Sequence, residues 1–207
     1  MIITYHGFGF VKLQVGEKIV AINPVGKDAD FKPARFGAHL ALISVNDSYY
    51  NGVENVTLAG KEPFVVSGPG EYEVDDVFIR GIETKGPVGE INTIYSIMID
   101  QTKILHLGAI TESEVSPEAV EAIGEVDILF VPVDSRIIDP KLASKLAFSF
   151  NPKIVIPVNH SVDEPKNSLS MFLKESGAES VKPVDKLVLK KKDILEKEGE
   201  VVIIKSF

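Results

Sequence analysis

The spacing of the apolar residues changes half-way along the chain, and this change constrains the fold most. Up to Gly108 they form short runs bounded by glycine or turn signals, a pattern typical of β-strands. Beyond Gly108, helical patterns alternate with buried strands. We therefore predict an α/β layered fold, an αββα sandwich of two mixed β-sheets with helices outside.

Turn and cap residues locate the expected elements. Strands are expected in segments 1–7, 8–16, 17–24 and 40–45, two strands around a Gly68–Gly70 turn in segment 61–83, and a hairpin in segment 92–108 that turns near Asp100 and Gln101. Helices are expected after Ser116, after Asp139 and between 167 and 177, with strands at 126–133, 153–159, 187–194 and 200–207. No linker or low-complexity block divides the chain, which predicts a single domain over residues 1–207.

Composition excludes several classes of function. The 207 residues include 30 acidic and 22 basic side chains, a net charge of −8, and no cysteine. Cysteine-based zinc sites, Fe–S clusters and thiolate nucleophiles are therefore absent. The acidic balance argues against a nucleic-acid partner, and the cluster Lys190–Lys192 is interpreted as a solvated strand end. No leader or long apolar segment stands out, so we expect no membrane partner and a cytoplasmic location.

Few residues are candidates for chemistry. No HxH, HExxH or GxSxG motif occurs, and the chain has four histidines. His39 has no partner pattern, so a surface or structural role is expected for it. His106 and His160 stand at the ends of predicted strands, as His6 does beside two glycines, and strand ends are where sites of α/β proteins gather. A structural role remains the alternative for these three residues.

Several segments, taken together and in order, resemble the metallo-β-lactamase-fold superfamily, in particular its small branch of metal-dependent hydrolases. They are YHGFGFVKL, IVAINP, ARFGAHLALIS, GPGEYEV, ILHLGAI, VDILFVPV and KIVIPVNHS, which together cover nearly the whole chain. The resemblance implies the αββα fold and a hydrolase ancestry with one or two zinc ions.

The metal-binding motifs of this family are degenerate here. Where the resemblance implies an HxHxDH loop, this chain has VNDSYYN. Val45, Asp47, Tyr49 and Tyr50 take the places of the first histidine, second histidine, aspartate and third histidine. Three further positions also depart from the family. Ala109 stands in place of the expected metal-bridging aspartate, and Asn23 in place of an early structural aspartate. Asn159 stands in place of the final histidine, with His160 one residue late.

These departures favour a metal-free, non-hydrolytic relative whose pocket is vestigial or reused, and leave two alternatives open. The loss of even a supporting partner of a metal ligand costs 10–100-fold in affinity, so the loss of most ligands removes the site and its activated water. The first alternative is a hydrolase with an unorthodox single-metal site for Zn or Mn, using Asp47, His106 and His160, with His6, Asn46 and Asn159 assisting. The second is an assembly or scaffolding protein in which the apolar segment VVIIKSF pairs at a sheet edge.

We expect no metal and no other cofactor in the leading hypothesis, with Asp47 and His160 as the residues that would hold a residual metal. The pocket is then lined by residues of the motif loop and of the later strand end. A small-molecule ligand and a homo-oligomer remain open, and the tyrosines either line the pocket or fill the volume of the former metal. The predicted lining residues are Asn46, Asp47, Tyr49, Tyr50, Asn51, Asn159 and His160.

Overall fold

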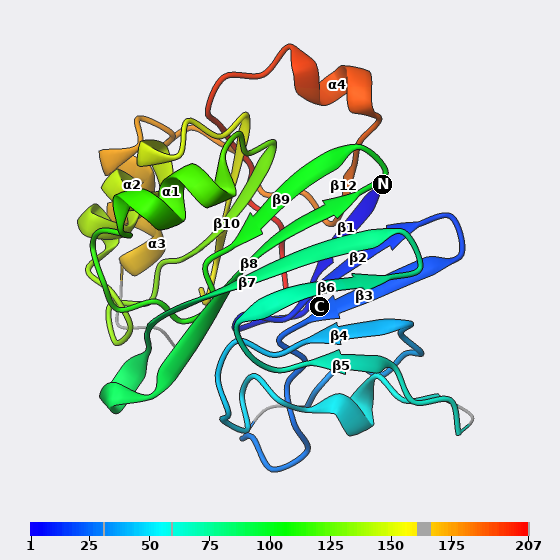
Figure 1. Ribbon diagram of the computed structural model, residues 1–207. Helices are drawn as coiled ribbons and strands as arrows, with labels where there is room; N and C mark the ends of the chain where they lie inside the picture. Colours follow the sequence, from blue (N-terminus) through cyan, green and yellow to red (C-terminus); the bar gives the residue numbers. More distant parts are fainter. Residues whose placement is uncertain (31, 59, 161–166, 207) are drawn as a thin grey trace.

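The computed structural model describes residues 1–30, 32–58, 60–160 and 167–206. Over these residues the chain forms two β-sheets that lie face to face, with helices outside them (Figure 1). Both sheets contain parallel and antiparallel pairs. The predicted αββα sandwich of two mixed sheets is confirmed.

The first sheet has six strands in its described part, and its order follows the chain except at one edge. β1, β2 and β3 are antiparallel neighbours, whereas β3, β4 and β5 run parallel. In spatial order the strands are β12 (Leu187–Val188), β1 (Ile2–Tyr5), β2 (Val11–Val15), β3 (Lys18–Ile22), β4 (Leu40–Leu42) and β5 (Phe64–Val66).

The second sheet has seven strands in its described part. Its first four strands in chain order, β6 to β9, form an antiparallel meander, and β9, β10, β11 and β13 run parallel. In spatial order the strands are β13 (Glu200–Val201), β11 (Ile154–Val158), β10 (Ile128–Pro132), β9 (Thr102–His106), β8 (Ile91–Ile99), β7 (Val77–Lys85) and β6 (Gly70–Val74).

Three of the helices in the described part of the chain begin where the sequence predicts. The Ser116 hydroxyl accepts a hydrogen bond from the Ala119 N–H at 3.2 Å, and the Asp139 carboxylate accepts one from the Lys141 N–H at 2.8 Å. These side chains satisfy backbone donors of the first turn, which otherwise have no partner in a helix. The elements are α1 (Pro117–Ile123), α2 (Pro140–Ser149), α3 (Ser168–Glu175) and the short α4 (Lys191–Leu195), with single 3₁₀ turns η1 (Val53–Asn55) and η2 (Pro87–Gly89).

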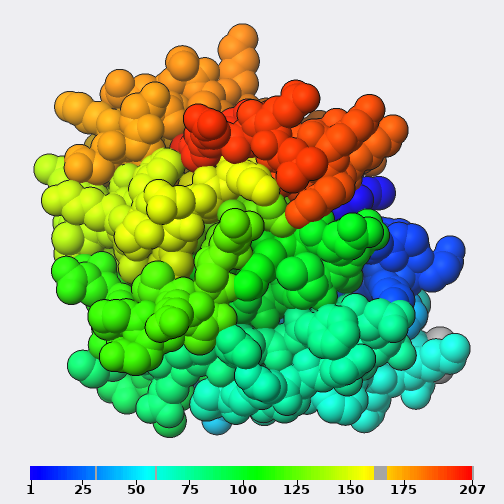
Figure 2. Space-filling model, turned by 45° about the horizontal axis from the view of Figure 1, so that its top comes forward, coloured from blue at the N-terminus to red at the C-terminus, as the bar shows by residue number. Residues whose placement is uncertain are grey.

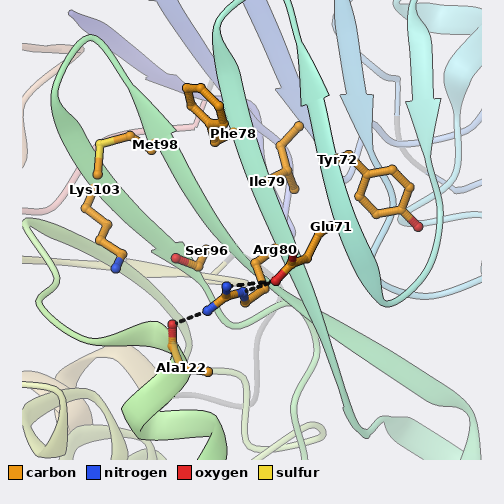
Figure 3. A pocket seen from close by; sticks show the side chains of 9 residues that line it. All are labelled: Glu71, Tyr72, Phe78, Ile79, Arg80, Ser96, Met98, Lys103 and Ala122. Carbon is orange, nitrogen blue, oxygen red and sulfur yellow. Dashed lines mark hydrogen bonds and ion pairs between the residues drawn. The ribbon is translucent and has the colours of Figure 1, made fainter.

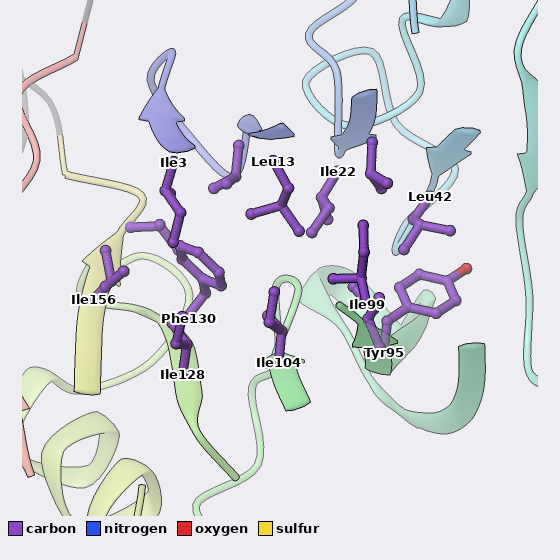
Figure 4. Close-up of a cluster of buried hydrophobic side chains, with 14 of the residues drawn as sticks. Ile3, Leu13, Ile22, Leu42, Tyr95, Ile99, Ile104, Ile128, Phe130 and Ile156 are labelled. Atoms are coloured by element: carbon purple, nitrogen blue, oxygen red, sulfur yellow. The ribbon is translucent and has the colours of Figure 1, made fainter. Parts of the chain in front are cut away.

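The main core lies between the two sheets. Ile3, Leu13 and Ile22 of the first sheet face Tyr95, Ile104 and other inward residues of the second (Figure 4). Alternate residues of each strand supply this layer, as the pleat of a sheet requires. A second core lies between the outer face of β8 to β11 and helices α1 to α3.

Three predictions about local structure were wrong. Segment 61–83 holds three strands, because Gly68 and Pro69 link one sheet to the other and the hairpin turn falls at Asp75 and Asp76 instead. Both aspartates have positive φ angles, 49° and 60°, which suit a two-residue turn between twisted strands.

Lys190–Lys192 does not end a strand: Lys191 begins α4, and the Asp193 carboxylate accepts a hydrogen bond from the Lys190 N–H. The last strand is only Glu200–Val201, and Phe207 of the predicted segment lies outside the described residues.

The ends of the chain lie together at one border of the sandwich. β12 pairs with β1, and isolated bridges join Ser206 to Tyr5 and Ile204 to Val184. The space-filling view shows the late segments beside the first residues (Figure 2). The VVIIKSF segment is therefore engaged within its own chain over its described residues. Within the described ranges, no helix has the length and apolar character needed to cross a bilayer.

Candidate functional site

Loops from both sheets meet at one end of the sandwich, where the resemblance places the metal centre. The Asn23 N–H after β3 donates to the Leu42 carbonyl, and the Thr93 N–H of β8 donates to the Ser44 carbonyl, both at 2.8 Å. The Asn159 N–H after β11 donates to the Phe8 carbonyl at 2.6 Å. Strand ends from both sheets thus position one cluster of loops, which is the candidate site.

The motif loop after β4 is a tight turn built around Asp47. The Asp47 carboxylate accepts a hydrogen bond from the Tyr49 N–H at 2.8 Å, and its carbonyl accepts from Tyr50 and Asn51. Beside it, the Asn51 side-chain amide donates to the Asn46 side-chain oxygen at 2.9 Å. Asp47 is exposed. One carboxylate oxygen therefore shapes the loop, as aspartates in turns commonly do.

Tyr50 is the centre of the candidate site. Its side chain is 7% exposed and packs with Val45 and Ala109, and Tyr49 and Ile137 flank this cluster. Its hydroxyl accepts a hydrogen bond from the Asn159 amide at 2.8 Å. Burial raises the pKa of the Tyr50 hydroxyl above its ordinary value, so the phenol stays protonated.

The loop between β1 and β2 closes over this tyrosine. The rings of Phe8 and Tyr49 lie 4.7 Å apart, centre to centre. A side chain at Gly9 would come within 3.1 Å of both the Asn23 amide nitrogen and the Tyr50 ring, so any larger residue would push these neighbours apart by a few tenths of an ångström. Asn23 in turn accepts a hydrogen bond from the Ser44 N–H at 2.8 Å.

His106 is buried and His160 is half-buried, and both are uncharged near neutral pH. Burial lowers the pKa of His106 to about 3, against a smaller opposing effect of the Gly9 backbone. Its Nδ1 accepts a hydrogen bond from the Gly108 N–H at 3.0 Å, which places the ring proton on Nε2. Burial also lowers the pKa of His160 to about 4, and this ring lies 4.8 Å from that of Tyr5.

His6 lies apart from the others against aromatic rings. Its ring centre is 5.1 Å from that of Phe10 and 5.6 Å from that of Phe36. Burial, and to a smaller extent the nearby positive charge of Lys12, lowers the pKa of His6 to about 4. His39 has a local role, because its Nδ1 accepts a hydrogen bond from the Ile19 N–H at 3.2 Å.

These residues do not fit the family's metal ions. At the positions implied for metal ligands stand two apolar side chains, Val45 and Ala109, and a buried phenol that is bonded to an amide. Zinc in enzymes is held by histidine, cysteine or carboxylate ligands with one position left for water. Within the described ranges, no three His, Cys, Asp or Glu side chains are grouped closely enough to hold a metal ion. Asp47, His106 and His160 therefore form no such group.

A groove of about 650 Å³ runs beside the motif loop. Its walls come from the loop after β4, from the turn between β5 and β6, and from the start of β8. Of the predicted pocket residues, the structure places Asn46 and Asn51 on it, whereas Tyr50 and Asn159 are buried beneath the loop. The remaining lining residues were not predicted and include Ser67, Gly68, Pro69, Glu90, Ile91 and Thr93.

Comparison with known proteins agrees with the fold. The profile of the β-lactamase superfamily domain matches residues 2–159. The chain is a member of the metallo-β-lactamase superfamily. No protein of curated function matches the sequence significantly.

Solved structures share the fold of this superfamily member over its whole length. A protein from Thermotoga maritima, provisionally described as a Zn-dependent hydrolase of the metallo-β-lactamase superfamily, is 28% identical, with a TM-score of 0.80 over 100% of this chain and 99% of its own. A provisionally described metal-dependent hydrolase from Parabacteroides distasonis is 18% identical, with a TM-score of 0.66 over 99% and 93%. The metallo-β-lactamase-fold protein YhfI from Bacillus subtilis is 12% identical, with a TM-score of 0.62 over 99% and 97%.

Proposed function

We propose that this chain is a metal-free, non-hydrolytic member of its superfamily that has kept the fold and a groove beside the former metal site. The observation that carries the proposal is the buried hydrogen bond between the Tyr50 hydroxyl and the Asn159 amide, inside a cluster with Val45 and Ala109. Neither group is a common ligand of zinc or manganese, and the ring occupies space beside the motif loop. Without a metal there is no activated hydroxide to attack a substrate.

Metal titration of the purified chain tests the proposal. Calorimetry with Zn²⁺ and Mn²⁺ is expected to show no stoichiometric binding by the natural chain. The matched control restores the family's ligands by substitution, and this variant is expected to bind. The substitutions are Val45→His, Asp47→His, Tyr49→Asp, Tyr50→His, Ala109→Asp and Asn159→His. A zinc-binding relative of the superfamily validates the assay if the restored chain does not fold.

The same experiment distinguishes the alternative hydrolase. Micromolar or tighter binding by the natural chain, weakened by Asp47→Asn or His160→Gln, would support a single-metal enzyme. Lactam, lactone, thioester and phosphodiester substrates are screened in parallel with added metal. Metal-dependent turnover that disappears in these variants would overturn the non-hydrolytic proposal.

The groove supports reuse for binding a small molecule that carries no negative charge. Among the described residues, no Lys, Arg or His side chain lines it. Glu90 supplies a carboxylate, and Val53, Val65 and Ile91 supply an apolar wall. Pockets of this size with an apolar body and a few polar groups are typical of small-ligand sites. The linked amides of Asn46 and Asn51 offer further hydrogen-bond donors and acceptors.

Nuclear magnetic resonance titration tests this use of the groove. Hexylamine is expected to shift the amide signals of Val65, Glu90 and Ile91 more strongly than hexanoate of equal length. Glu90→Gln should remove the preference for the amine, whereas Glu62→Gln, an exposed carboxylate outside the groove, should leave it unchanged. Equal shifts by both compounds, or none, would contradict the assigned ligand class without affecting the proposal of a metal-free site.

A further inference from the structure

Over the residues that the structure describes, part of the outer face of the second sheet carries no helix. Helices α1 to α3 cover the outer face of β9 to β11 and the part of β8 around Ile94, and the rest of the outer face of β6 to β8 extends beyond them (Figure 1). Two large apolar side chains on this part of the face are exposed to solvent: Phe78 is 51% exposed and Met98 is 36% exposed. They are direct cross-strand partners on β7 and β8. A paired, exposed Phe and Met is the kind of surface that proteins bury against a partner.

Strand register places these two residues at the centre of a row with opposite charges at its ends. Glu73 on β6 is opposite Phe78, Phe78 is opposite Met98, and Met98 is opposite Lys103 on β9. The row therefore reads acidic, apolar, apolar, basic across four strands. Figure 3 shows Phe78, Met98 and Lys103 side by side around a shallow cavity of about 280 Å³.

The charges of the neighbouring row are already used within the chain. Arg80 forms an ion pair with Glu71 at 2.7 Å, and its guanidinium also donates to the Ala122 carbonyl of α1 at 2.6 Å (Figure 3). By contrast, Glu73 and Lys103 form no ion pair with any residue in the described part of the chain. The free charges of this face are thus those at the two ends of the central row.

We propose that this face is a two-fold interface with a second copy of the same chain. The axis runs parallel to the strands between β7 and β8. A half-turn about it places Phe78 over Met98 of the partner subunit, and Glu73 over Lys103 of the partner subunit, and each contact occurs twice. Such self-complementarity is what an isologous dimer requires.

The row itself favours a second copy over an unrelated partner. A complementary surface must read basic, apolar, apolar, acidic, and this chain presents that order when it is turned over. The net charge of −8 repels copies from each other in general, so attraction depends on a local match of this kind. Four strands spaced about 4.8 Å apart give a row about 14 Å wide. The contact is therefore small, and we expect a weak dimer with a Kd on the order of 10–100 µM.

Charge reversal tests the interface directly. Sedimentation velocity of the full chain from about 5 to about 500 µM should show a dimer whose fraction grows with concentration. Glu73→Lys and Lys103→Glu should each leave the chain monomeric over the same range, because each places like charges opposite one another. The double variant carries the row in reverse order and restores both pairs, so it should dimerise again.

Matched controls separate the interface from net charge. Glu179→Lys and Lys182→Glu change the net charge by the same amounts at exposed positions outside this face, and they should leave the dimer intact. Phe78→Ser should weaken it at least tenfold at unchanged net charge. A natural chain that stays monomeric at about 500 µM would overturn the proposal. So would a dimer that survives both single reversals, or one that the double variant does not restore.

Discussion

Replacement of Tyr50 by alanine removes the ring that fills the centre of the candidate site. The side chain is 7% exposed, packs with Val45 and Ala109, and bonds to Asn159 through its hydroxyl. Deletion of a buried aromatic ring costs about 3–5 kcal/mol, because both the transfer free energy and the contacts around the new cavity are lost. We therefore expect the free energy of unfolding to fall by about 3–5 kcal/mol, of which about 1 kcal/mol is the hydrogen bond.

Urea denaturation measures this loss. With a slope of about 2–3 kcal/mol per molar urea for a chain of this size, the unfolding midpoint should fall by about 1–2 M. Tyr50→Phe keeps the ring but leaves the Asn159 amide without its acceptor, and should cost only about 1–2 kcal/mol. The neighbouring Tyr49 is half-buried, so Tyr49→Ala should cost less than Tyr50→Ala.

A different result would refute the packing argument. If Tyr50→Ala changed the free energy of unfolding by less than about 1 kcal/mol, the ring would not be filling a closed volume. The tyrosine would then line an open pocket, and the site would be reused at the former metal position itself. The order of the losses in free energy of unfolding among the three variants distinguishes a filled volume from an open pocket, because Tyr50→Phe removes only the hydroxyl and Tyr50→Ala removes the ring as well.

Two further predictions concern stability. The folded-state pKa values of His6, His106 and His160, about 4, 3 and 4, lie below the ordinary value of 6.5, so the unfolded chain binds more protons between these limits. The stability that these groups confer is complete above pH 6.5, and it falls by about 1.4 kcal/mol per pH unit for each histidine as the pH drops toward 4. Urea unfolding midpoints measured from about pH 7 to about pH 4.5 should show this slope. A midpoint that does not change with pH would contradict the prediction. Separately, Asp127→Asn should cost about 1–3 kcal/mol in thermal or urea unfolding, because the buried carboxylate accepts hydrogen bonds from the Lys103 N–H and from two lysine side chains. The exposed Asp185, which pairs with Lys205, is the control: Asp185→Asn should cost under about 1 kcal/mol, and equal losses would refute the assignment.

Much of the fold could be predicted from local sequence, because helix caps and turns are formed by residues that lie within a few positions of one another in the chain. Ser116 and Asp139 cap helices through hydrogen bonds to residues two or three positions away. Asp100 and Gln101 form their turn with positive φ angles between two alternating runs. By contrast, α4 has five residues, and its anchor is the burial of Ile194 in the core between the sheets. Such a tertiary contact has no local signature.

The site could be predicted only in part for the same reason. The resemblance indicated that Tyr50 in the motif loop and Asn159 after β11 stand where the family has metal ligands, and the structure joins these two residues although they are 109 positions apart. The far wall of the groove was missed because only the folded chain brings it beside the motif loop. This wall consists of Ser67–Pro69, Glu90, Ile91 and Thr93. Polar residues such as Glu90 look like ordinary turn residues until that pairing is known.

Elemental analysis of the protein, purified without chelator from cells grown with zinc, manganese and iron, tests the central claim most directly. The account predicts less than about 0.1 metal ion per chain, since a buried tyrosine and two apolar side chains stand at positions where the resemblance implies metal ligands. Zinc, manganese or iron at one ion or more per chain, retained through gel filtration, would contradict it.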